Sequence, residues 1–317
     1  MMTATAPLAA ATEPSGAAAL AAMPDALGRR PSGASKAASR TSLFGVAPFL
    51  LYTGIFLLLP TVLVAIGAFF TRQGVFTTSG FERLLAPASI TIFWTSTWLS
   101  VVTAVLGAVI GAVVAYALST SPPNSLGRRV FTAFNSVLAQ FGGVMLAFAF
   151  VATIGTNGML TRFLQGAAGF QVDSGFLSSV PGLVAVYLYF QVPLMVIVFL
   201  PAVDGIRREW RDATVMLGGS SLVYWFRVAG PLLAPSFLGS VLLLFANSFS
   251  AFATAAALIS QQTIIVPMEI EAALRNENTA GLESYAQALA LGMIVVVAIV
   301  MSLYALLQKR SARWLSR

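Results

Sequence analysis

Six long apolar stretches constrain this chain more than any other feature. They cover residues 43–70, 90–118, 130–155, 180–203, 232–258 and 285–307. None of them contains Asp, Glu, Lys or Arg, and each is longer than the roughly 20 residues that a helix needs to cross a bilayer. They show none of the period-two alternation of barrel strands. The stretches therefore predict six transmembrane helices.

Composition agrees with a lipid environment. Hydrophobic residues make up 58% of the chain and charged residues 9%, and the mean hydropathy is +0.86, whereas a soluble domain is about 25% charged. We therefore expect an all-α membrane protein. Cysteine and histidine are both absent, which removes disulfides, thiolate chemistry, and the commonest general base and metal ligand. This argues against a membrane-embedded enzyme, and we expect no metal site.

Basic residues are distributed unevenly among the segments between these stretches. Fourteen of the 18 Lys and Arg residues lie in the two terminal tails and in the 119–129 and 204–231 loops. With the acids included, these segments carry +9 and the alternate segments −2. The positive-inside rule then places both termini and the 204–231 loop in the cytoplasm. The membrane topology thus explains the excess of basic over acidic residues, and we expect no nucleic-acid partner.

The chain is predicted to have three parts. Residues 1–42 are rich in Ala, Pro, Ser and Gly and bury little apolar surface, so we expect a disordered cytoplasmic tail. Its Ala-rich part precedes the charges and is interrupted by Glu13 and Pro14, which makes it a poor signal peptide. A transmembrane domain is expected over 43–310, and a basic C-terminal tail over 311–317. Met23 is an alternative start to Met1.

The spans also bear on the source of energy. Secondary transporters and pumps usually need an intramembrane ionisable group to carry a coupling ion, and these spans have none. A secondary active transporter is the main alternative reading, because carbonyls and hydroxyls can hold Na⁺ by themselves. The chain has no GxxxxGK[ST] loop, so we expect no nucleotide hydrolysis on a Walker site of its own. Energy for moving a solute would then come from another chain.

Polar uncharged residues enter the predicted spans at several positions. They either form hydrogen bonds between helices or line a translocation path. Asn247 and Ser250 are the stronger path candidates, since they lie one turn apart beside other small polar residues. The full set of candidates is Asn135, Gln140, Gln191, Asn247, Ser250 and Thr254.

Small residues and helix breakers mark two further features of the spans. Gly107, Gly111 and Ala115 recur every four residues, a spacing that lets helix backbones approach closely. Pro193 and the Gly142-Gly143 pair are expected to kink their helices.

The 204–231 loop has its own helical pattern. Ile206, Trp210, Ala213, Met216 and Leu217 recur mostly every three or four residues, which predicts a helix with one apolar face. Gly218-Gly219 should end this helix, and Ser220 or Ser221 should cap a second short one. Gly230 is expected to end the second helix and Pro231 to lead into the fifth span. The loop is therefore predicted to form a helix–turn–helix bracket on the membrane surface.

The spacing within this bracket resembles the EAA motif of binding-protein-dependent ABC importer permeases of type I. Asp212-Ala213-Thr214, three residues, Gly218, nine residues and Val228-Ala229-Gly230-Pro231 match the pattern E-A-A-x3-G-x9-I-x-L-P. The glycine and the terminal proline are at the family's spacing. Asp212, Thr214, Val228 and Gly230 depart from the family pattern, and the side chain of Asp212 is one methylene shorter than the family's glutamate.

This resemblance implies the function of the loop and the partners of the chain. The loop would be the coupling helix, with Ala213, Met216 and Leu217 in a groove of a cytoplasmic ATPase, Asp212 paired with a basic residue and Gly218 permitting the turn. The chain would bind no cofactor, because ATP and Mg²⁺ would bind to the ATPase. Its other partners would be a second permease subunit, an extracytoplasmic solute-binding protein and membrane lipid. The location would be the bacterial cytoplasmic membrane.

Two further segments resemble one branch of this family in particular. FGGVMLAFAFVATIGTNG at 141–158 and FANSFSAFATAAAL at 245–258 are similar to permeases of the polyamine-type branch. That branch implies a small polar solute, a polyamine or a similar molecule, rather than a sugar.

Overall fold

A computed structural model describes residues 46–71, 73–169, 175–259, 265–275 and 281–315, and all statements below refer to these residues. For 168 and 308–315 only the backbone is described. The tail predicted over 1–42 lies outside the described residues. By its internal contacts the chain divides into two units, Met1–Pro60 and Thr61–Arg317.

Six stretches of helix are long and apolar enough to span a bilayer, which confirms the predicted number. They are Val46–Gly67, Pro87–Ser119, Gly143–Ala167, Val180–Asp204, Ser221–Phe249 and Leu282–Leu307. The only β-type pairing among the described residues is an isolated bridge between Phe70 and Phe76. The protein is therefore all-α, as its composition predicts.

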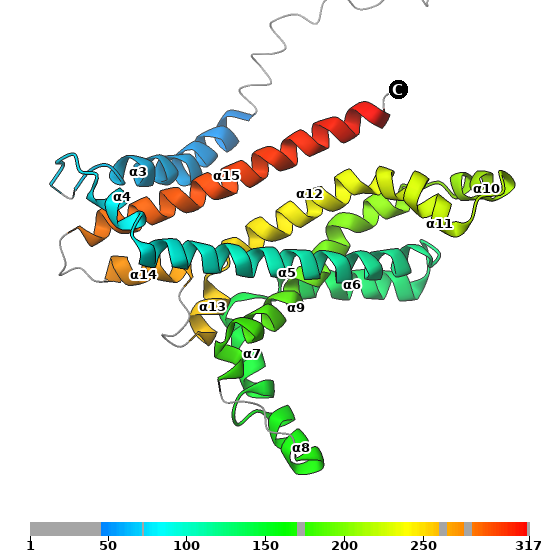
Figure 1. The fold of residues 1–317 in the computed structure, drawn as a ribbon, viewed down its shortest axis with the longest axis horizontal. Coiled ribbons are helices and arrows are strands. Elements are labelled where there is room, and N and C mark those ends of the chain that lie inside the picture. The colour runs from blue at the N-terminus through cyan, green and yellow to red at the C-terminus, as the bar shows by residue number, and fades with distance from the viewer. Residues whose placement is uncertain (1–45, 72, 170–174, 260–264, 276–280, 316–317) are drawn as a thin grey trace, which may run out of the picture. The chain divides into compact units, whose positions relative to one another are not determined.

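The elements follow one another as helices joined by short connections (Figure 1). The described residues before α4 form a helix from Val46, with a π-turn at Gly54–Leu58, and α3, Leu59–Gly67. The second unit continues with α4 Ser79–Leu84, α5 Pro87–Ser119, α6 Leu126–Gln140, α7 Gly143–Ile154, α8 Met159–Ala168, a 3-10 turn Phe176–Ser178, α9 Val180–Asp204, α10 Arg208–Met216, α11 Ser221–Tyr224, a π-turn Trp225–Ala229, α12 Gly230–Phe249, α13 Ala253–Leu258, α14 Val266–Arg275 and α15 Leu282–Leu315.

The bounds of the third and fifth spans differ from the prediction. The apolar stretch 130–155 is divided, because α6 ends at Gln140 and α7 begins at Gly143, whose φ is +69°. A helix interior cannot hold such a φ, so the Gly142-Gly143 pair breaks the helix rather than kinking it. The third span runs instead from Gly143 to Ala167, with a non-helical connection between α7 and α8. The fifth begins at Ser221 and ends at Phe249, so Thr254 lies outside it in α13. Pro193 lies within the continuous α9.

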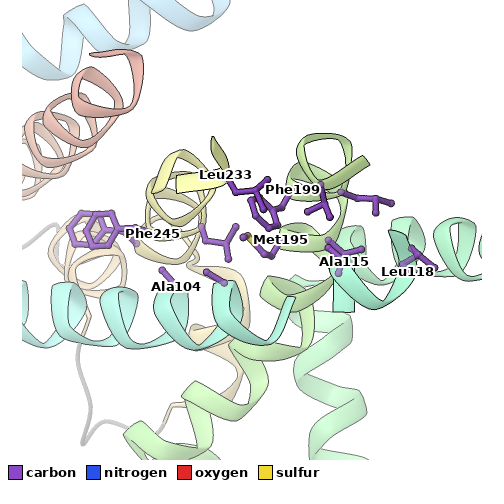
Figure 2. Packing of buried hydrophobic residues seen from close by; sticks show 13 residues of the cluster. Ala104, Ala115, Leu118, Met195, Phe199, Leu233 and Phe245 are labelled. Atoms are coloured by element: carbon purple, nitrogen blue, oxygen red, sulfur yellow. The ribbon is translucent and has the colours of Figure 1, made fainter. Parts of the chain in front are cut away.

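The core of the second unit is the mutual packing of α5, α9 and α12. Figure 2 shows Ala104, Ala115 and Leu118 of α5 facing Met195 and Phe199 of α9, with Leu233 and Phe245 contributed by α12. These side chains are buried, whereas much of the remaining surface of the spans is apolar and exposed. Such surface is expected in a protein whose solvent is lipid.

The predicted small-residue stripe makes this packing possible. A Cβ added to Gly107 would lie 2.9 Å from Gln191 Cβ, and one added to Gly111 would lie 2.5 Å from Met195 Cβ and 2.9 Å from the Val192 carbonyl oxygen. Ala115 is fully buried. Real Cβ atoms do not approach neighbouring atoms this closely, so α5 and α9 depend on the missing side chains. The interpretation of Gly107, Gly111 and Ala115 as packing residues is confirmed.

Hydrogen bonds connect the N-terminal half of α5 to α14 and α15. The Ser89 hydroxyl lies 2.8 Å from the Tyr285 hydroxyl of α15. The Ser96 hydroxyl accepts a hydrogen bond from the Val266 amide, the first residue of α14, at 2.9 Å. Because all four residues are buried, these bonds satisfy polar groups that have no access to water. The α14–α15 hairpin is thereby held against α5.

Gly111→Ala should destabilise the protein by about 1–3 kcal/mol, because the added methyl would force α5 and α9 apart. Gly127→Ala is the matched control, since a Cβ there would meet nothing within 4 Å; it should change stability by no more than about 1 kcal/mol. Thermal unfolding in detergent measures both variants. Equal unfolding temperatures would show that the close contact contributes nothing.

Candidate functional site

The segment between α9 and α12 contains α10, which ends as predicted. The amide of Gly218 donates to the Val215 carbonyl at 2.9 Å, and that of Gly219 donates to the Thr214 carbonyl at 2.9 Å. This pair of bonds is a Schellman motif, which needs a left-handed residue after the helix. Gly218 supplies it with φ +76°. The helix and its glycine stop are therefore confirmed.

The second half of the bracket differs from the prediction. Ser220 caps α11 by accepting a hydrogen bond from the Val223 amide at 3.4 Å, but no separate short helix follows. The helix continues from Ser221 through Gly230 and Pro231 to Phe249, so the prediction that Gly230 ends a helix is wrong. A π-turn precedes Gly230, whose amide donates to the Trp225 carbonyl. A single π-turn of this kind holds one residue more than an α-helical turn and does not end the helix.

The five residues predicted to form the apolar face of this helix divide into an inner and an outer group. Ile206, which precedes α10, and Trp210 are half-buried, and the half-buried Thr214 donates a hydrogen bond to the Trp210 carbonyl at 2.7 Å. The outer group is Ala213, Met216 and Leu217, which we name the outer arc. All three are exposed, Met216 by 89% and Leu217 by 88%. The loop thus presents apolar side chains that nothing in the described chain covers.

Asp212 lies beside the outer arc and is also exposed. Within the described chain its carboxylate has no hydrogen bond and no ion pair. Pro231 is exposed in the continuous helix. The structure therefore keeps Asp212, Ala213, Met216, Leu217 and Gly218 together on one short segment, with Pro231 some distance along the chain.

An ion pair positions this segment against the 119–129 loop. Arg128 pairs with Asp204 at the end of α9, and its guanidinium also donates to the Ser121 carbonyl at 3.3 Å. Beside the pair lies a cleft of about 860 Å³, lined by Tyr116, Ser119, Thr120, Pro123, Arg128, Val203, Asp204, Ile206, Arg207, Arg208, Arg211, Asp212, Tyr224 and Trp225. Sequence reasoning missed this cleft, since only the fold brings α5, α9 and α11 together.

Three of the six predicted path residues are buried and serve as connections between helices. The Asn135 side-chain amide donates to the Pro193 carbonyl at 2.8 Å, and the Gln191 amide donates to the Leu244 carbonyl at 2.9 Å. The Thr254 hydroxyl donates to the Gly143 carbonyl at 3.3 Å. These bonds link α6 to α9, α9 to α12, and α13 to α7. The geometry favours the packing interpretation for these three residues.

The other three predicted path residues are exposed. Gln140 is the last residue of α6, and Ser250 follows α12 and donates to the Ala246 carbonyl at 2.9 Å. Asn247 is exposed within the fifth span, and its side chain has no hydrogen bond among the described residues. The structure thus places Asn247 and Ser250 on an accessible part of the bundle and does not bring all six candidates together.

Two polar arrangements in the bundle interior, one of them at the candidate residue Gln191, were not predicted from the sequence. Thr103 of α5 and Ser248 of α12 are buried with their hydroxyl oxygens 2.8 Å apart. The Gln191 Oε1 atom is buried and has no hydrogen-bond partner among the described residues, in contrast to the amide nitrogen of the same side chain. The polar residues were visible in the sequence, but their pairing depends on how helices that are far apart in the chain rotate against each other.

No cluster of three or more Asp, Glu, His or Cys side chains that could hold a metal ion occurs within the part of the chain that the structure describes. The charged residues of the loop are mainly arginines, which are cationic and bind no metal.

Comparisons with known proteins fit this arrangement of helices. Residues 107–313, more than half of the chain, match the family described as "Binding-protein-dependent transport system inner membrane component". A chain of a bacterial ABC transporter involved in importing the acidic polysaccharide alginate is similar with TM-score 0.67 and 17% identity, over 88% of this chain and 98% of that one. A chain of a bacterial alginate transporter bound to a periplasmic protein carrying an alginate pentasaccharide gives TM-score 0.67 and 15% identity, over 88% and 96%. A search of curated proteins found no significant match.

At these identities the two structures show a shared fold and nothing about solute. The family match decides the class of protein, and it replaces the alternative of a secondary active transporter. Members of this family are the non-catalytic membrane components of ABC importers, and nucleotide binds to a partner ATPase. The chain belongs to the family of binding-protein-dependent transport system inner membrane components, and it is a multi-pass permease subunit of an ABC importer.

Proposed function

We propose that this permease lies in a bacterial cytoplasmic membrane with both termini and the 204–231 loop in the cytoplasm. The uneven distribution of arginine and lysine supports this orientation, since fourteen of the 18 lie in those segments together with the 119–129 loop. In the proposed layout residues 1–42 form a cytoplasmic tail, 43–310 the transmembrane domain and 311–317 a basic tail.

The 204–231 loop is proposed to couple the permease to a cytoplasmic ATPase. The observation that carries this proposal is the exposed outer arc beside the unpaired carboxylate of Asp212. The arc lies on a short helix and its C-terminal end, outside the six spans, so its apolar surface is not part of a membrane-spanning helix. An amphipathic helix of this kind suits a groove on a partner protein. Burial of one large apolar side chain such as Leu217 contributes about 1.5–3 kcal/mol.

Coupling to the solute path would use the continuous helix that follows the bracket. Ser221–Phe249 runs without interruption from the loop to the residues beside Asn247. When two ATPases close on ATP and Mg²⁺, a docked α10 would move with its ATPase, and the helix would transmit that movement into the bundle. This is rigid-body switching between two global states. A second permease subunit, or a second copy of this chain, would provide the other half of the path.

Asn247, Ser250 and Gln140 are proposed to face that path. An exposed amide without a partner is costly in hydrocarbon, so polar groups inside spans generally face the bundle interior or a water-filled cavity. Asn247 meets this description, since it lies within the fifth span and has no partner in the described chain. Asn135, Gln191 and Thr254 are proposed to hold the helices beside the path in place.

The proposed solute is a polyamine or a similar small polar molecule, delivered by an extracytoplasmic binding protein. The similarity of 141–158 and 245–258 to polyamine-type permeases supports this choice. In the structure these segments form α7 with its following turn and the end of α12 with α13, and α7 packs against α13. Two segments selected for their resemblance thus lie side by side.

Leu217→Ser should weaken binding of the ATPase about ten-fold and lower solute-stimulated ATP hydrolysis, because it removes apolar surface from the docking face. Leu126→Ser is the matched control, since Leu126 is also exposed, by 76%, at the start of α6. Co-purification of the ATPase and hydrolysis in vesicles are the measurements. Asp212→Lys, which reverses the unpaired charge, should have the same effect. Normal coupling in both loop variants would contradict the docking role.

Asn247→Leu should lower the transport rate about ten-fold, which corresponds to ~1.4 kcal/mol of lost polar stabilisation along the path, without changing the unfolding temperature. Leu238→Ala, on an exposed position of the same helix, is the control. Gln191→Leu should instead change the unfolding temperature, since it removes a buried connection between α9 and α12. Transport at the wild-type rate by Asn247→Leu would place the path elsewhere.

Uptake by the complete system should persist when a protonophore collapses the proton gradient, provided that ATP is maintained, and should stop when ATP is depleted. Labelled spermidine is the probe, and an unlabelled acidic oligosaccharide should not compete with it. Loss of uptake with the proton gradient would contradict the proposed energy source. ATP-dependent uptake of another solute without spermidine uptake would contradict only the proposed solute.

A further inference from the structure

The cleft beside the Arg128–Asp204 pair has a composition that ATPase docking does not explain. Its wall includes four arginines, two aspartates and the aromatic residues Tyr116, Tyr224 and Trp225. None of the outer-arc residues Ala213, Met216 and Leu217 lines it. The cleft and the proposed docking face are therefore separate surfaces of the same loop, and only Asp212 lies at both.

The cleft lies at the ends of three spans. The second span ends at Ser119, the fourth ends at Asp204 and the fifth begins at Ser221. The cleft is lined by Ser119 and Asp204 themselves and, in the first turns of the fifth span, by Tyr224 and Trp225. Tyr116 and Trp225 pack edge to face with their ring centroids 5.1 Å apart. Tyrosine and tryptophan are enriched where a membrane protein crosses the headgroup level. Residues of both types line the cleft where these spans end.

Three of the four arginines have guanidinium groups without a partner. Arg128 is paired with Asp204, whereas Arg207, Arg208 and Arg211 form no ion pair or side-chain hydrogen bond in the described chain. With Asp212 as the one unpaired acid in the lining, the cleft carries a net charge of +2. Guanidinium groups bind phosphate oxygens through two parallel hydrogen bonds, and a volume of about 860 Å³ is ample for a phosphate-bearing headgroup.

We propose that this cleft binds the phosphate group of an anionic phospholipid through Arg207, Arg208 and Arg211, with Tyr116 and Trp225 beside the glycerol region. Basic clusters immediately beside transmembrane helices are a recognised form of anionic-lipid site, and each arginine near the surface contributes about five-fold to binding. The bound lipid would connect the α9–α10 corner to the end of α5. It would thus hold α10 in place from the membrane side.

Lipid is favoured over an acidic partner protein because the cleft is lined by residues near the ends of spans, Tyr116 and Trp225 among them, as well as by the loop. A soluble phosphate compound shares the same recognition chemistry, so the experiment includes it as a separate arm. The inference does not depend on ATPase docking, because lipid binding is measured on the permease chain without ATP.

The test uses the full-length chain reconstituted in phosphatidylcholine vesicles containing 20% spin-labelled phosphatidylglycerol, a fraction of about one lipid in five chosen to keep the surface anionic. Electron spin resonance measures the immobilised lipid. The cleft variant carries Arg207→Gln, Arg208→Gln and Arg211→Gln. The control carries Arg129→Gln, Arg227→Gln and Lys309→Gln, basic residues of the segments proposed to be cytoplasmic that are not among the cleft residues and give the same change in net charge.

The cleft variant should lose at least about ten-fold in affinity for phosphatidylglycerol, while the control stays within about two-fold of wild type. Equal losses in both would overturn the proposal, since general surface charge would then account for the binding. Displacement of the label by millimolar inorganic pyrophosphate would support the phosphate chemistry but assign the site to a soluble anion. If the triple variant fails to fold, Arg211→Gln and Arg211→Lys replace it, and only the lysine should retain most of the binding.

Discussion

The close packing of α5 against α9 is the contact on which the other features of this permease depend. A bilayer offers little hydrophobic driving force between helices, so their association relies on van der Waals contact and on hydrogen bonds. Gly107 and Gly111 allow the contact, and Gln191 and Met195 occupy the space that side chains on α5 would otherwise fill. The position of α9 in turn sets the position of Asp204, whose pair with Arg128 orients the 119–129 loop beside α10.

We propose that this arrangement gives α10 and the adjoining loop two binding partners. The outer arc of α10 is exposed and apolar, and we propose an ATPase for it. The arginines between α10 and the ends of α5 and α9 line a cleft, and we propose an anionic phospholipid there. Both surfaces connect to the bundle through one uninterrupted helix, Ser221–Phe249. A coupling segment needs this stiffness, because a flexible connection would absorb the movement that it has to transmit.

The sequence correctly predicted the helix that stops at Gly218, but it did not predict that the next helix continues from Ser221 through Gly230 to Phe249. The glycine stop at Gly218 is local, because a Schellman motif needs only a left-handed residue and nearby carbonyls. The continuation of the helix through Gly230 and Pro231 is not decided by neighbouring residues alone. A π-turn shifts the hydrogen-bond register at Trp225–Ala229, and the burial of Tyr224 and Ala229 accompanies it. The rule that treats a glycine after a helix as a stop therefore ended the helix too early at Gly230.

By itself, the sequence determined the number of spans, the membrane environment, the small-residue contact face and the family-like spacing around Asp212 and Gly218. Each of these follows from apolar length, composition or short-range spacing, which are properties of consecutive residues. Only the tertiary structure decided which polar residues connect helices and which are accessible, because Asn135, Gln191 and Asn247 look alike in sequence. Their environments depend on how helices distant in the chain are rotated against one another, and so does the cleft that Arg207, Arg208 and Arg211 share with Tyr116.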